Sequence, residues 1–463
     1  MWFIIIVIGL MVRTDTLGVT SIMRALSLAA PSYPLLLNFF RSESFELYEI
    51  ELKWQTIISK LPFLYRVRNM VVMVGDGVKQ FKEGRYMPGV KKLHQESENS
   101  AKAEYIFGHL FGGIGVLVGN TQEKLYCVLL SLRLHEGLKA IRNWWKGDTN
   151  GSAETHINEE THVVKTIKDA GRASRVFGSV LLLLDRLYLT VPMLKTLALF
   201  PQISVVTKAK KNASAFYHPK PRKGPGAKAK KGEKIKVISL FETMADSFQK
   251  TTAMMYGTVK EISYYSEDFL WGEKLYKNLR FVLVWLDGVK TILVSTDLAL
   301  TPVEIIELYC HRFKIECSFR ELKQVIAGFS YRFWSKHMPK LNRFKPNDYI
   351  QEMLEAITDE SKRACIAGTV KAIECFTLLS CISLGLLQII SILFSDTITG
   401  AGIRYMRTPS KGIPSEATVA DFMRKTIYQL FGFFPNLPIT GIIKNRQSVP
   451  DVCDEGRLDT LSA

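Results

Sequence analysis

The sequence contains little cysteine. Its 463 residues include seven cysteines, an odd and scattered set without a C-x-x-C pair. No Cys/His cluster has the spacing of a structural zinc site, which needs four closely grouped thiolate or imidazole ligands. We therefore expect neither a disulfide framework nor a structural metal, and a reducing cytosol fits the composition best.

Acidic residues are also in short supply. The chain has 44 Asp and Glu against 61 Lys and Arg, which gives a net charge of +17. A surplus of this size favours a polyanionic partner, either nucleic acid or an anionic membrane surface. Composition alone does not decide between the two.

Long apolar runs are few, and two of them need a membrane test. Residues 1–12 lack a basic leading region and a small-residue cleavage site, and charge follows at Arg13. We expect a buried N-terminal element there. Residues 375–394 are uncharged and long enough to cross a bilayer, but their small and polar positions recur about every three residues, which favours a helix packed inside the protein. A basic membrane-associated protein is the alternative interpretation.

The remaining pattern is typical of an α/β fold. Continuous apolar, β-branched runs predict buried strands, and Asp287-Gly288 predicts the turn of a hairpin. Helices are expected before the first strand, between strands and over most of the C-terminal part. The predicted strands are 69–77, 103–119, 124–134, 176–186 and 202–207, with the hairpin at 279–297.

A strongly basic run interrupts this alternation. Residues 208–236 contain eleven Lys and Arg and one acid, Glu233, interleaved with Pro and Gly. That composition predicts a solvated loop or linker inserted into the domain. It is either a contact for the DNA backbone or a plain solubilising linker.

Two predicted strands end in an aspartate, Asp76 and Asp185. Catalytic side chains of α/β sheets emerge at the carboxyl ends of strands, although a single aspartate there is more often a turn former. Asp297 also follows a strand and competes for the second position. It lies too close to the next helix to leave room for the inserted region, so we expect it to form a turn.

A helix is predicted from Thr301, an N-cap followed by Pro302 and by Glu304 at the third position. At 100° per residue, five of its side chains fall within a stripe about 80° wide. They are Tyr309, Arg312, Glu316, Arg320 and Lys323. Alone, such a stripe is more typical of a surface ladder of ion pairs, each worth ~0.3–0.5 kcal/mol.

The two aspartates change this interpretation. Three carboxylates can hold two Mg²⁺ ions about 4 Å apart, one activating the attacking water or hydroxyl and one stabilising the leaving oxygen of a phosphodiester. The cations beside Glu316 would then hold DNA phosphates.

At these residues the sequence resembles the DDE transposases of bacterial insertion sequences that carry the Y-(2)-R-(3)-E-(6)-K signature. Tyr309, Arg312, Glu316 and Lys323 meet every spacing of that signature. The blocks "VVMVGDGVK" and "LLLLDRLYL" resemble the family's first and second aspartate blocks. The resemblance covers roughly residues 70–335; the signature is fairly specific, whereas each aspartate block is weak on its own.

The resemblance implies a ribonuclease H-like mixed sheet with an inserted region before the last catalytic helix. It implies Asp76, Asp185 and Glu316 as the catalytic, metal-binding triad for Mg²⁺ or Mn²⁺, with two ions. The implied reaction is nicking at the ends of the insertion sequence, followed by attack of the freed 3′-hydroxyl on target DNA.

The family's signature also implies DNA contacts. Tyr309, Arg312 and Lys323 match the positions that touch phosphates of the element's ends. Members of the family commonly act as dimers, so a homodimer on double-stranded DNA is expected, without a membrane partner. The expected location is the prokaryotic cytoplasm, in association with the nucleoid.

Three further residues are candidate DNA contacts. Arg320 lies outside the signature and is included for its place on the helix alone. Lys82 opens a basic block, 82–102, that either lines the DNA path or forms a solvated loop. Trp271 is a candidate for stacking on a flipped base, with a structural role as the alternative.

These expectations divide the chain into five segments. They are a helical N-terminal region at 1–66, a candidate for DNA-end binding; the first part of the ribonuclease H-like core at 67–207; the basic inserted region at 208–278; the second part of the core with the catalytic helix at 279–340; and a helical C-terminal region at 341–463, a candidate for oligomerisation.

Two interpretations beside the membrane protein stay open: a non-transposase nuclease of the same fold, and a non-catalytic DNA-binding protein. The sequence does not give the end sequence recognised, the target preference, the cleavage route or the oligomeric state. It also does not say whether this copy is full-length and active.

Overall fold

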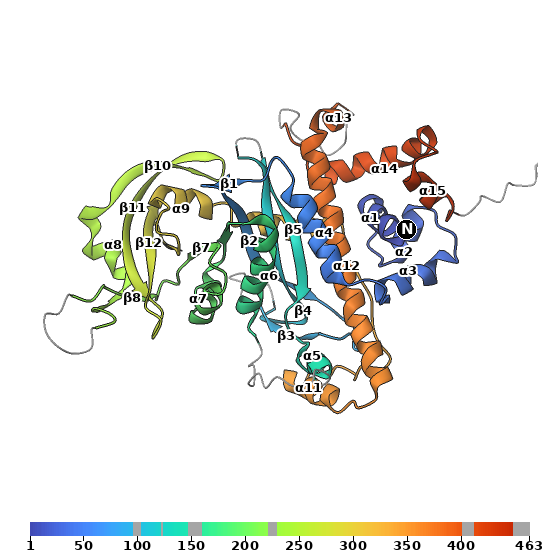
Figure 1. Ribbon diagram of the computed structural model, residues 1–463, viewed down its shortest axis with the longest axis horizontal. Helices are drawn as coiled ribbons and strands as arrows, with labels where there is room; N and C mark the ends of the chain where they lie inside the picture. The colour runs from blue at the N-terminus through green and yellow to red at the C-terminus, as the bar shows by residue number, and fades with distance from the viewer. Residues whose placement is uncertain (96–102, 122–123, 147–159, 221–228, 401–411, 448–463) are drawn as a thin grey trace, which may run out of the picture.

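The structure, a computed structural model, describes six stretches of the chain: 1–95, 103–121, 124–146, 160–220, 229–400 and 412–447. The centre of the predicted basic run 208–236 and the end of the block 82–102 lie outside the described residues. Figure 1 shows an elongated molecule in which a central sheet separates a β-rich lobe from a helical region.

Thirteen strands of the described residues form one sheet. They are β1 (Arg66–Val67), β2 (Met70–Phe81), β3 (Lys91–His94), β4 (Tyr105–Asn120), β5 (Lys124–Leu134), β6 (Val180–Leu183), β7 (Ile203–Lys208), β8 (Ser214–Phe216), β9 (Lys234–Lys236), β10 (Gln249–Met255), β11 (Thr258–Trp271), β12 (Lys277–Leu286) and β13 (Val289–Ser295). The order is β3-β4-β2-β6-β7-β13-β12-β11-β8-β9, with β5 on β4, β1 on β2 and β10 on β11.

The centre of this sheet mixes antiparallel and parallel strands. β2 is antiparallel to β4 and parallel to β6, and β6 is parallel to β7. These strands are continuous apolar runs because helices cover both of their faces. The strands predicted at 103–119, 124–134 and 202–207 are confirmed as β4, β5 and β7.

Two helices lie on opposite faces at the centre of the sheet. Gly77 of β2 faces α6 (His162–Phe177), since a Cβ there would meet His162. Its neighbour Asp76 contacts Arg312, which directly precedes α10 (Lys314–Gln324). Successive residues of a strand point to opposite faces, so α6 and α10 sandwich β2 between them.

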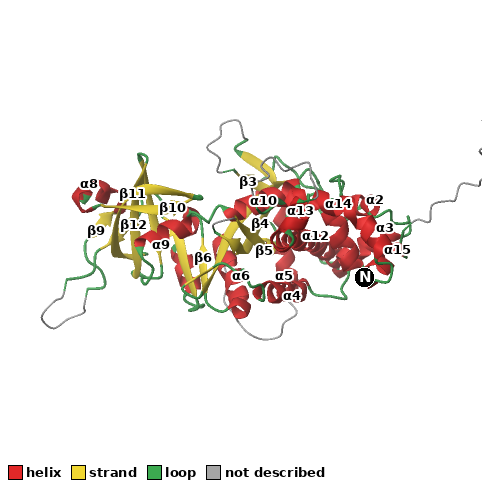
Figure 2. Cartoon of the chain, turned by 90° about the horizontal axis from the view of Figure 1, so that it is seen from above, coloured by secondary structure: helices red, strands yellow, loops and turns green. Residues whose placement is uncertain are grey.

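The other helices pack around this centre. They are α1 (Trp2–Val12), α2 (Thr20–Ala25), α3 (Ser32–Arg41), α4 (Leu47–Ser59), α5 (Lys139–Lys146), η1 (Arg186–Tyr188), α7 (Val191–Leu197), η2 (Val237–Ser239), α8 (Leu240–Thr243), η3 (Ala245–Ser247), α9 (Pro302–Tyr309), α11 (Asn347–Glu355), α12 (Glu360–Leu393), α13 (Ser395–Thr399), α14 (Glu416–Phe433) and α15 (Pro438–Lys444). In Figure 2, α12 runs between the sheet and the N-terminal helices.

The two apolar runs of the sequence meet inside the helical region. α1 is buried as expected for residues 1–12, and Ser383 of α12 donates a hydrogen bond to the Val7 carbonyl at 3.2 Å. Among the described helices, α12 alone is long and apolar enough to cross a bilayer, with a mean hydropathy of 2.2 over its most apolar stretch, but 72% of that stretch is buried. This burial is typical of a core helix, and length and composition alone are weak evidence for a membrane span.

The structure differs from the prediction at three places in the sheet. Asp76 lies in the middle of β2, because pairing with β4 continues as far as Phe81. The strand predicted at 176–186 begins only at Val180, since α6 extends to Phe177. The long hairpin of β10 and β11 was not predicted, because polar and apolar residues are mixed along it.

The β-rich lobe is joined to the central sheet by hydrogen-bonded strands. β13 pairs antiparallel with β7 over three residues, Leu293↔Lys208, Val294↔Thr207 and Ser295↔Val206. The predicted hairpin is confirmed as β12 and β13, with positive φ at both Asp287 and Gly288, as a two-residue type I′ turn requires. Strands from the segments predicted as insertion and as second core part therefore form one sheet.

Close packing of α12 makes a testable prediction. A Cβ at Gly385 would lie 2.5 Å from the ring of Trp54, whose indole N–H is already bonded to the Leu129 carbonyl at 2.9 Å. The rigid ring must shift, so Gly385→Ala should lower the free energy of unfolding by about 1–3 kcal/mol. Urea denaturation measures this change.

The same helix provides the matched control. A Cβ at Gly368 would meet nothing within 4 Å, so Gly368→Ala should stabilise the protein by up to about 1 kcal/mol through helix propensity. Equal effects of the two substitutions would contradict the close contact between α12 and α4.

Candidate active site

Strand register brings the two predicted aspartates level with one another. In the parallel pair of β2 and β6, Val74 lies opposite Leu183. Asp76 and Asp185 each follow two residues later, Asp76 still within β2 and Asp185 just beyond the end of β6. The Asp185 carbonyl accepts a hydrogen bond from Thr207 of β7 at 2.8 Å, which fixes the chain where it leaves β6.

The helix predicted from Thr301 is broken in two. Thr301 and Glu304 form the expected capping box of α9. α9 ends at Tyr309, and the next amides bond three residues back, Arg312 N–H to the Tyr309 carbonyl at 3.1 Å among them. α10 then starts at Lys314. This tight turn replaces the single continuous stripe expected from a helical wheel.

The turn places Arg312 between two carboxylates. Its guanidinium donates to Asp76 Oδ2 at 2.6 Å and also to Glu316 Oε1. The Arg312 side chain is 13% exposed, whereas Glu316 is 56% exposed. Arg312 is therefore a largely buried cation that ties the first strand aspartate to the helix glutamate.

The three carboxylates influence the pKa values of Asp76 and Arg312. Burial raises the pKa of Asp76 to about 6; Arg312 opposes this increase, and the charges of Asp185 and Glu316 add to it. Burial lowers the pKa of Arg312, but the same three carboxylates outweigh burial and raise it above the ordinary value. Opposite charges at short range favour the ionised forms of both partners.

A basic pocket opens beside this ion pair. It has a volume of about 570 Å³ and reaches both Asp76 and Glu316. Its other described charged lining residues are all cations, Lys79, Arg320 and Lys323. An anionic ligand in this pocket would lie next to the carboxylates, which is the arrangement that phosphodiester chemistry needs.

The remaining predicted site residues lie at different distances from this pocket. Tyr309 is near Asp185: burial raises the pKa of its hydroxyl, and the charge of Asp185 adds to the increase. Arg320 lines the pocket and pairs with Glu321 at 2.8 Å. Lys323 also lines it.

Two predicted DNA contacts lie away from the pocket. Lys82 is 8% exposed and its ammonium donates to the carbonyls of Phe329 and Tyr331, so we leave it out of the candidate DNA surface. Trp271 ends β11 and lines a separate pocket of about 300 Å³, with Leu189 just after η1 among its neighbours. Asp297 forms a turn as expected, its carboxylate accepting from the Ala299 amide at 2.8 Å.

The donor chemistry of the site fits a hard divalent cation. Asp76, Asp185 and Glu316 are all carboxylates, and oxygen ligands are those that Mg²⁺ and Mn²⁺ prefer. Within the described residues, however, no group of three acidic, histidine or cysteine side chains is gathered closely enough to hold a metal. The position between Asp76 and Glu316 is taken by Arg312.

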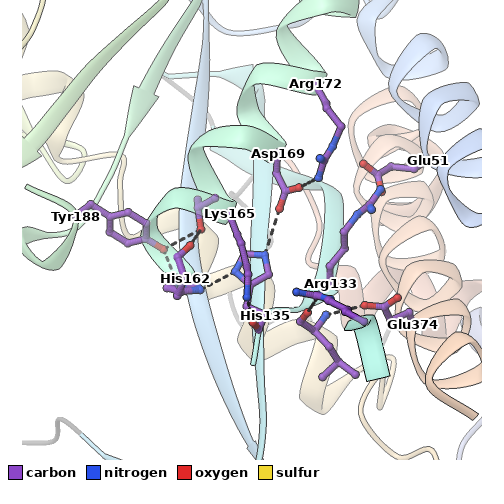
Figure 3. Close-up of polar contacts among 12 residues, drawn as sticks. Glu51, Arg133, His135, His162, Lys165, Asp169, Arg172, Tyr188 and Glu374 are labelled. Carbon is purple, nitrogen blue, oxygen red and sulfur yellow. Dashed lines mark hydrogen bonds and ion pairs between the residues drawn. The ribbon is translucent and has the colours of Figure 1, made fainter. Parts of the chain in front are cut away.

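A buried polar chain lies on the opposite face of β2 (Figure 3). Tyr188 contacts His162 Nε2 at 2.7 Å, the two histidines meet Nδ1 to Nδ1 at 2.7 Å, and His135 Nε2 lies 3.3 Å from Asp169. With Asp169 as a carboxylate, one direction of donation satisfies the whole chain: tyrosine to His162, His162 to His135, and His135 to Asp169. Arg172 pairs with the far side of Asp169.

Paired glycines make room for the two imidazoles. Gly77 of β2 lies opposite Gly112 of β4. A Cβ at Gly77 would be 2.7 Å from His162, and one at Gly112 would be 2.0 Å from His135. The recess and its histidines therefore hold Tyr188, three residues after Asp185, in a fixed position.

This network was not predicted from the sequence. Its members are separated by up to 53 residues, from His135 to Tyr188, and a single histidine gives no spacing signal. One feature of the sequence could have indicated this network. Two predicted strands contain glycines, in the motifs "GDG" and "GG", and glycine inside a strand often marks close approach by another group.

His162, which is partly buried, predicts a pH dependence of stability. Burial, and next the neighbouring His135, lower the pKa of His162 to about 3, below the ordinary value near 6.5 in the unfolded chain. The unfolded state therefore binds more protons between pH 3 and 6.5, so this contribution is complete above pH 6.5 and is lost as the pH falls. Replacing His162→Gln should reduce the slope of unfolding free energy against pH in that window, by up to about 1.4 kcal/mol per pH unit.

Urea denaturation at a series of pH values measures the slope. His94→Gln is the control, because the His94 side chain is 51% exposed and its replacement should leave the slope nearly unchanged. The same slope in the wild type and in His162→Gln would contradict a buried, neutral His162.

Part of the chain is similar to a known protein family. Residues 152–344 match the family model described as Transposase DDE domain. The match takes in Asp185 and Glu316 but begins after Asp76. The searches of curated proteins and of solved structures gave no match. The chain therefore contains a segment similar to a transposase DDE domain, a similarity that suggests transposase activity with DNA as the partner.

Proposed function

We propose that this protein is a transposase that cuts DNA at the ends of an insertion sequence and joins the 3′-hydroxyl ends to target DNA. One observation carries the proposal: Asp76 of β2 and Asp185, just beyond the end of the parallel strand β6, share a charged site with a helix glutamate, beside a basic pocket. The match of residues 152–344 to a transposase DDE domain supports it.

The proposal includes a ribonuclease H-like core. The antiparallel strands β5, β4 and β2 followed by the parallel strands β6 and β7 support this assignment. In this proposal the insertion between β7 and the helix of Glu316 takes in the strands β8 to β13, and so extends beyond the segment 208–278 expected from the sequence. A homodimer assembled on DNA and a location at the prokaryotic nucleoid are parts of the same proposal.

Asp76, Asp185 and Glu316 would hold the divalent ions, Mg²⁺ or Mn²⁺. When bound, such ions activate the attacking oxygen and stabilise the leaving oxygen of the phosphodiester. The chain's own residues orient the DNA: Arg320 and Lys323 line the pocket, where their charges attract phosphates. Tyr309, near Asp185, has a hydroxyl that remains protonated at neutral pH and can donate to a phosphate oxygen.

Arg312 has two successive roles in this proposal. In the protein without DNA it neutralises Asp76 and Glu316, a short-range pairing that offsets the cost of burying Asp76. When DNA binds, a phosphate takes over the guanidinium, since Arg binds phosphate as readily as carboxylate. Release of Arg312 leaves the carboxylates free for the metal.

Loss of the helix carboxylate tests the proposed reaction. Glu316→Gln should bind DNA that carries the flanking inverted repeats as well as the wild type does. It should cut that DNA far more slowly, beyond the about 10–100-fold that loss of an outer-shell metal partner causes. Gel analysis of the DNA ends with Mg²⁺ measures cleavage, and a mobility shift measures binding.

Glu321→Gln is the matched control on the same helix, because Glu321 pairs with Arg320 and does not line the pocket. It should cut at nearly the wild-type rate. If wild type and Glu316→Gln bind the ends equally and both leave them uncut, the proposed reaction is wrong for this protein.

The pairing of Arg312 with Asp76 and Glu316 predicts that removing Arg312 changes the affinity for metal. In DNA-free protein, Arg312→Ala should bind Mn²⁺ about tenfold more tightly or better, because a cation that competes for Asp76 and Glu316 is gone. The electron paramagnetic resonance of free Mn²⁺ gives the affinity without any need for activity. The same variant should bind DNA ends less well.

Arg320→Ala is the control for this measurement. Arg320 lines the same pocket but pairs with Glu321 rather than with the three carboxylates, so its loss should change Mn²⁺ affinity little. Equal Mn²⁺ affinities of Arg312→Ala and Arg320→Ala would show that Arg312 does not compete with the metal.

A further inference from the structure

The segment that follows α10 alternates buried and exposed side chains. In residues 331–336 (YRFWSK), the inward members are Tyr331, Phe333 and Ser335, and the outward members are Arg332, Trp334 and Lys336. A period of two is that of an extended chain, so the outward residues form one row with neighbours about 7 Å apart. We name Arg332, Trp334 and Lys336 the outer row.

The inward side chains anchor this segment to the core. The Tyr331 hydroxyl is 2.6 Å from His109 Nδ1. The ring of Phe333 packs against those of Phe40 and Phe376, with centroids 5.4 and 6.2 Å away. The outer row therefore rests on side chains that are fixed by α3 and α12.

Lys82 holds the backbone at the start of this segment. Its ammonium donates to two carbonyls of the segment, those of Phe329 and Tyr331, and lies 3.5 Å from the centroid of the Tyr331 ring. The amide of Ser335 is bonded to the Tyr86 carbonyl at 3.1 Å. A ligand of the outer row would meet a preformed surface, which lowers the entropic cost of binding.

The outer row borders a basic and aromatic pocket of about 670 Å³. α3 contributes Tyr33 and Arg41 to the wall, and Glu43 is the only acid among the described lining residues. No described carboxylate lies within ion-pair distance of Arg332, Lys336 or Arg41. Their charges are thus available to an anion.

Trp334 indicates what kind of anion the outer row fits. Its side chain is 57% exposed although it is a large aromatic, and it stands between the two cations of the row. An exposed indole between cations matches a nucleic-acid strand, in which an unpaired base stacks on the ring and the flanking phosphates meet the charges. In a duplex the bases are already stacked and paired, so the ring has no free base face to cover.

We propose that the outer row, with Arg41 across the pocket, binds a single-stranded segment of DNA. The site shares no lining residue with the pocket beside Asp76 and Glu316. The choice of DNA over RNA rests on the proposed transposase function; the single-strand preference rests on the geometry of the outer row alone. Strand separation near a cut would supply such a segment.

Binding without metal tests this proposal independently of catalysis. The probe is a fluorescently labelled 20-nucleotide single strand of mixed sequence, compared with its duplex, in a buffer with EDTA, by fluorescence anisotropy. Trp334→Ala should weaken single-strand binding about tenfold, since stacking of one base is worth that much, and should change duplex binding less than about twofold. Trp285→Ala, which removes a 42% exposed tryptophan of β12, is the matched control and should change neither.

The salt dependence of binding tests the phosphate contacts proposed for Arg332 and Lys336. In the double variant Arg332→Ala/Lys336→Ala, the slope of log affinity against log salt for the single strand should become shallower by about 1.4, as expected for two lost phosphate contacts. Lys60→Ala at the end of α4 is the control for a lost exposed charge and should leave the slope unchanged.

Each outcome decides the proposal. It is overturned if Trp334→Ala weakens binding no more than Trp285→Ala, if it weakens single strand and duplex alike, or if the double variant keeps the wild-type salt slope. Tighter binding of the same strand made of RNA would overturn the choice of DNA. Failure of Glu316→Gln to affect cleavage would refute the proposed reaction without touching these binding results.

Discussion

The ion pair between Arg312 and Asp76 is the interaction on which the candidate site depends. Asp76 is a largely buried carboxyl in the middle of a strand, with its side chain 18% exposed, a position that is costly for a charge without a partner. Arg312 is the partner, and the tight turn between α9 and α10 places it on the face of β2 to which Asp76 points. Because the same guanidinium also binds Glu316, one cation sets the position of two of the three predicted ligands.

The third predicted ligand, Asp185, is positioned by strand register and by contacts on the other face of β2. Asp185 leaves β6 level with Asp76 through strand register alone, and its backbone is held by Thr207. Three residues later, Tyr188 is fixed by the two histidines in the glycine recess. Charge pairing thus organises one face of β2, and directional hydrogen bonds between mostly buried groups organise the other.

Local signals in the sequence predicted much of this arrangement. The capping box at Thr301, the Asp287-Gly288 turn and the strands β4 and β5 follow from short-range chemistry, and the structure has them. The position of Asp76 within β2 depends on how far β4 continues to pair, which is a long-range property. The break around Arg312 could not be read from helical periodicity, since the stripe of Tyr309, Arg312 and Glu316 keeps a helical spacing and no Gly or Pro marks the turn. The burial of Lys82 could not be predicted for a related reason: a lysine in a basic block is normally solvated, and only the tertiary fold supplies carbonyls that hold it inside.

The short β7–β13 pairing has a mechanical consequence. Three residue pairs carry the sheet from the centre into the β-rich lobe, so the lobe is joined to the centre by paired strands and not by a connecting loop alone. A load applied to the lobe reaches Thr207 of β7 directly, and Thr207 is bonded to the carbonyl of Asp185. A force on a molecule bound to the lobe would therefore reach the backbone of Asp185, a predicted metal ligand, through the β13–β7 pairing and the Thr207 hydrogen bond.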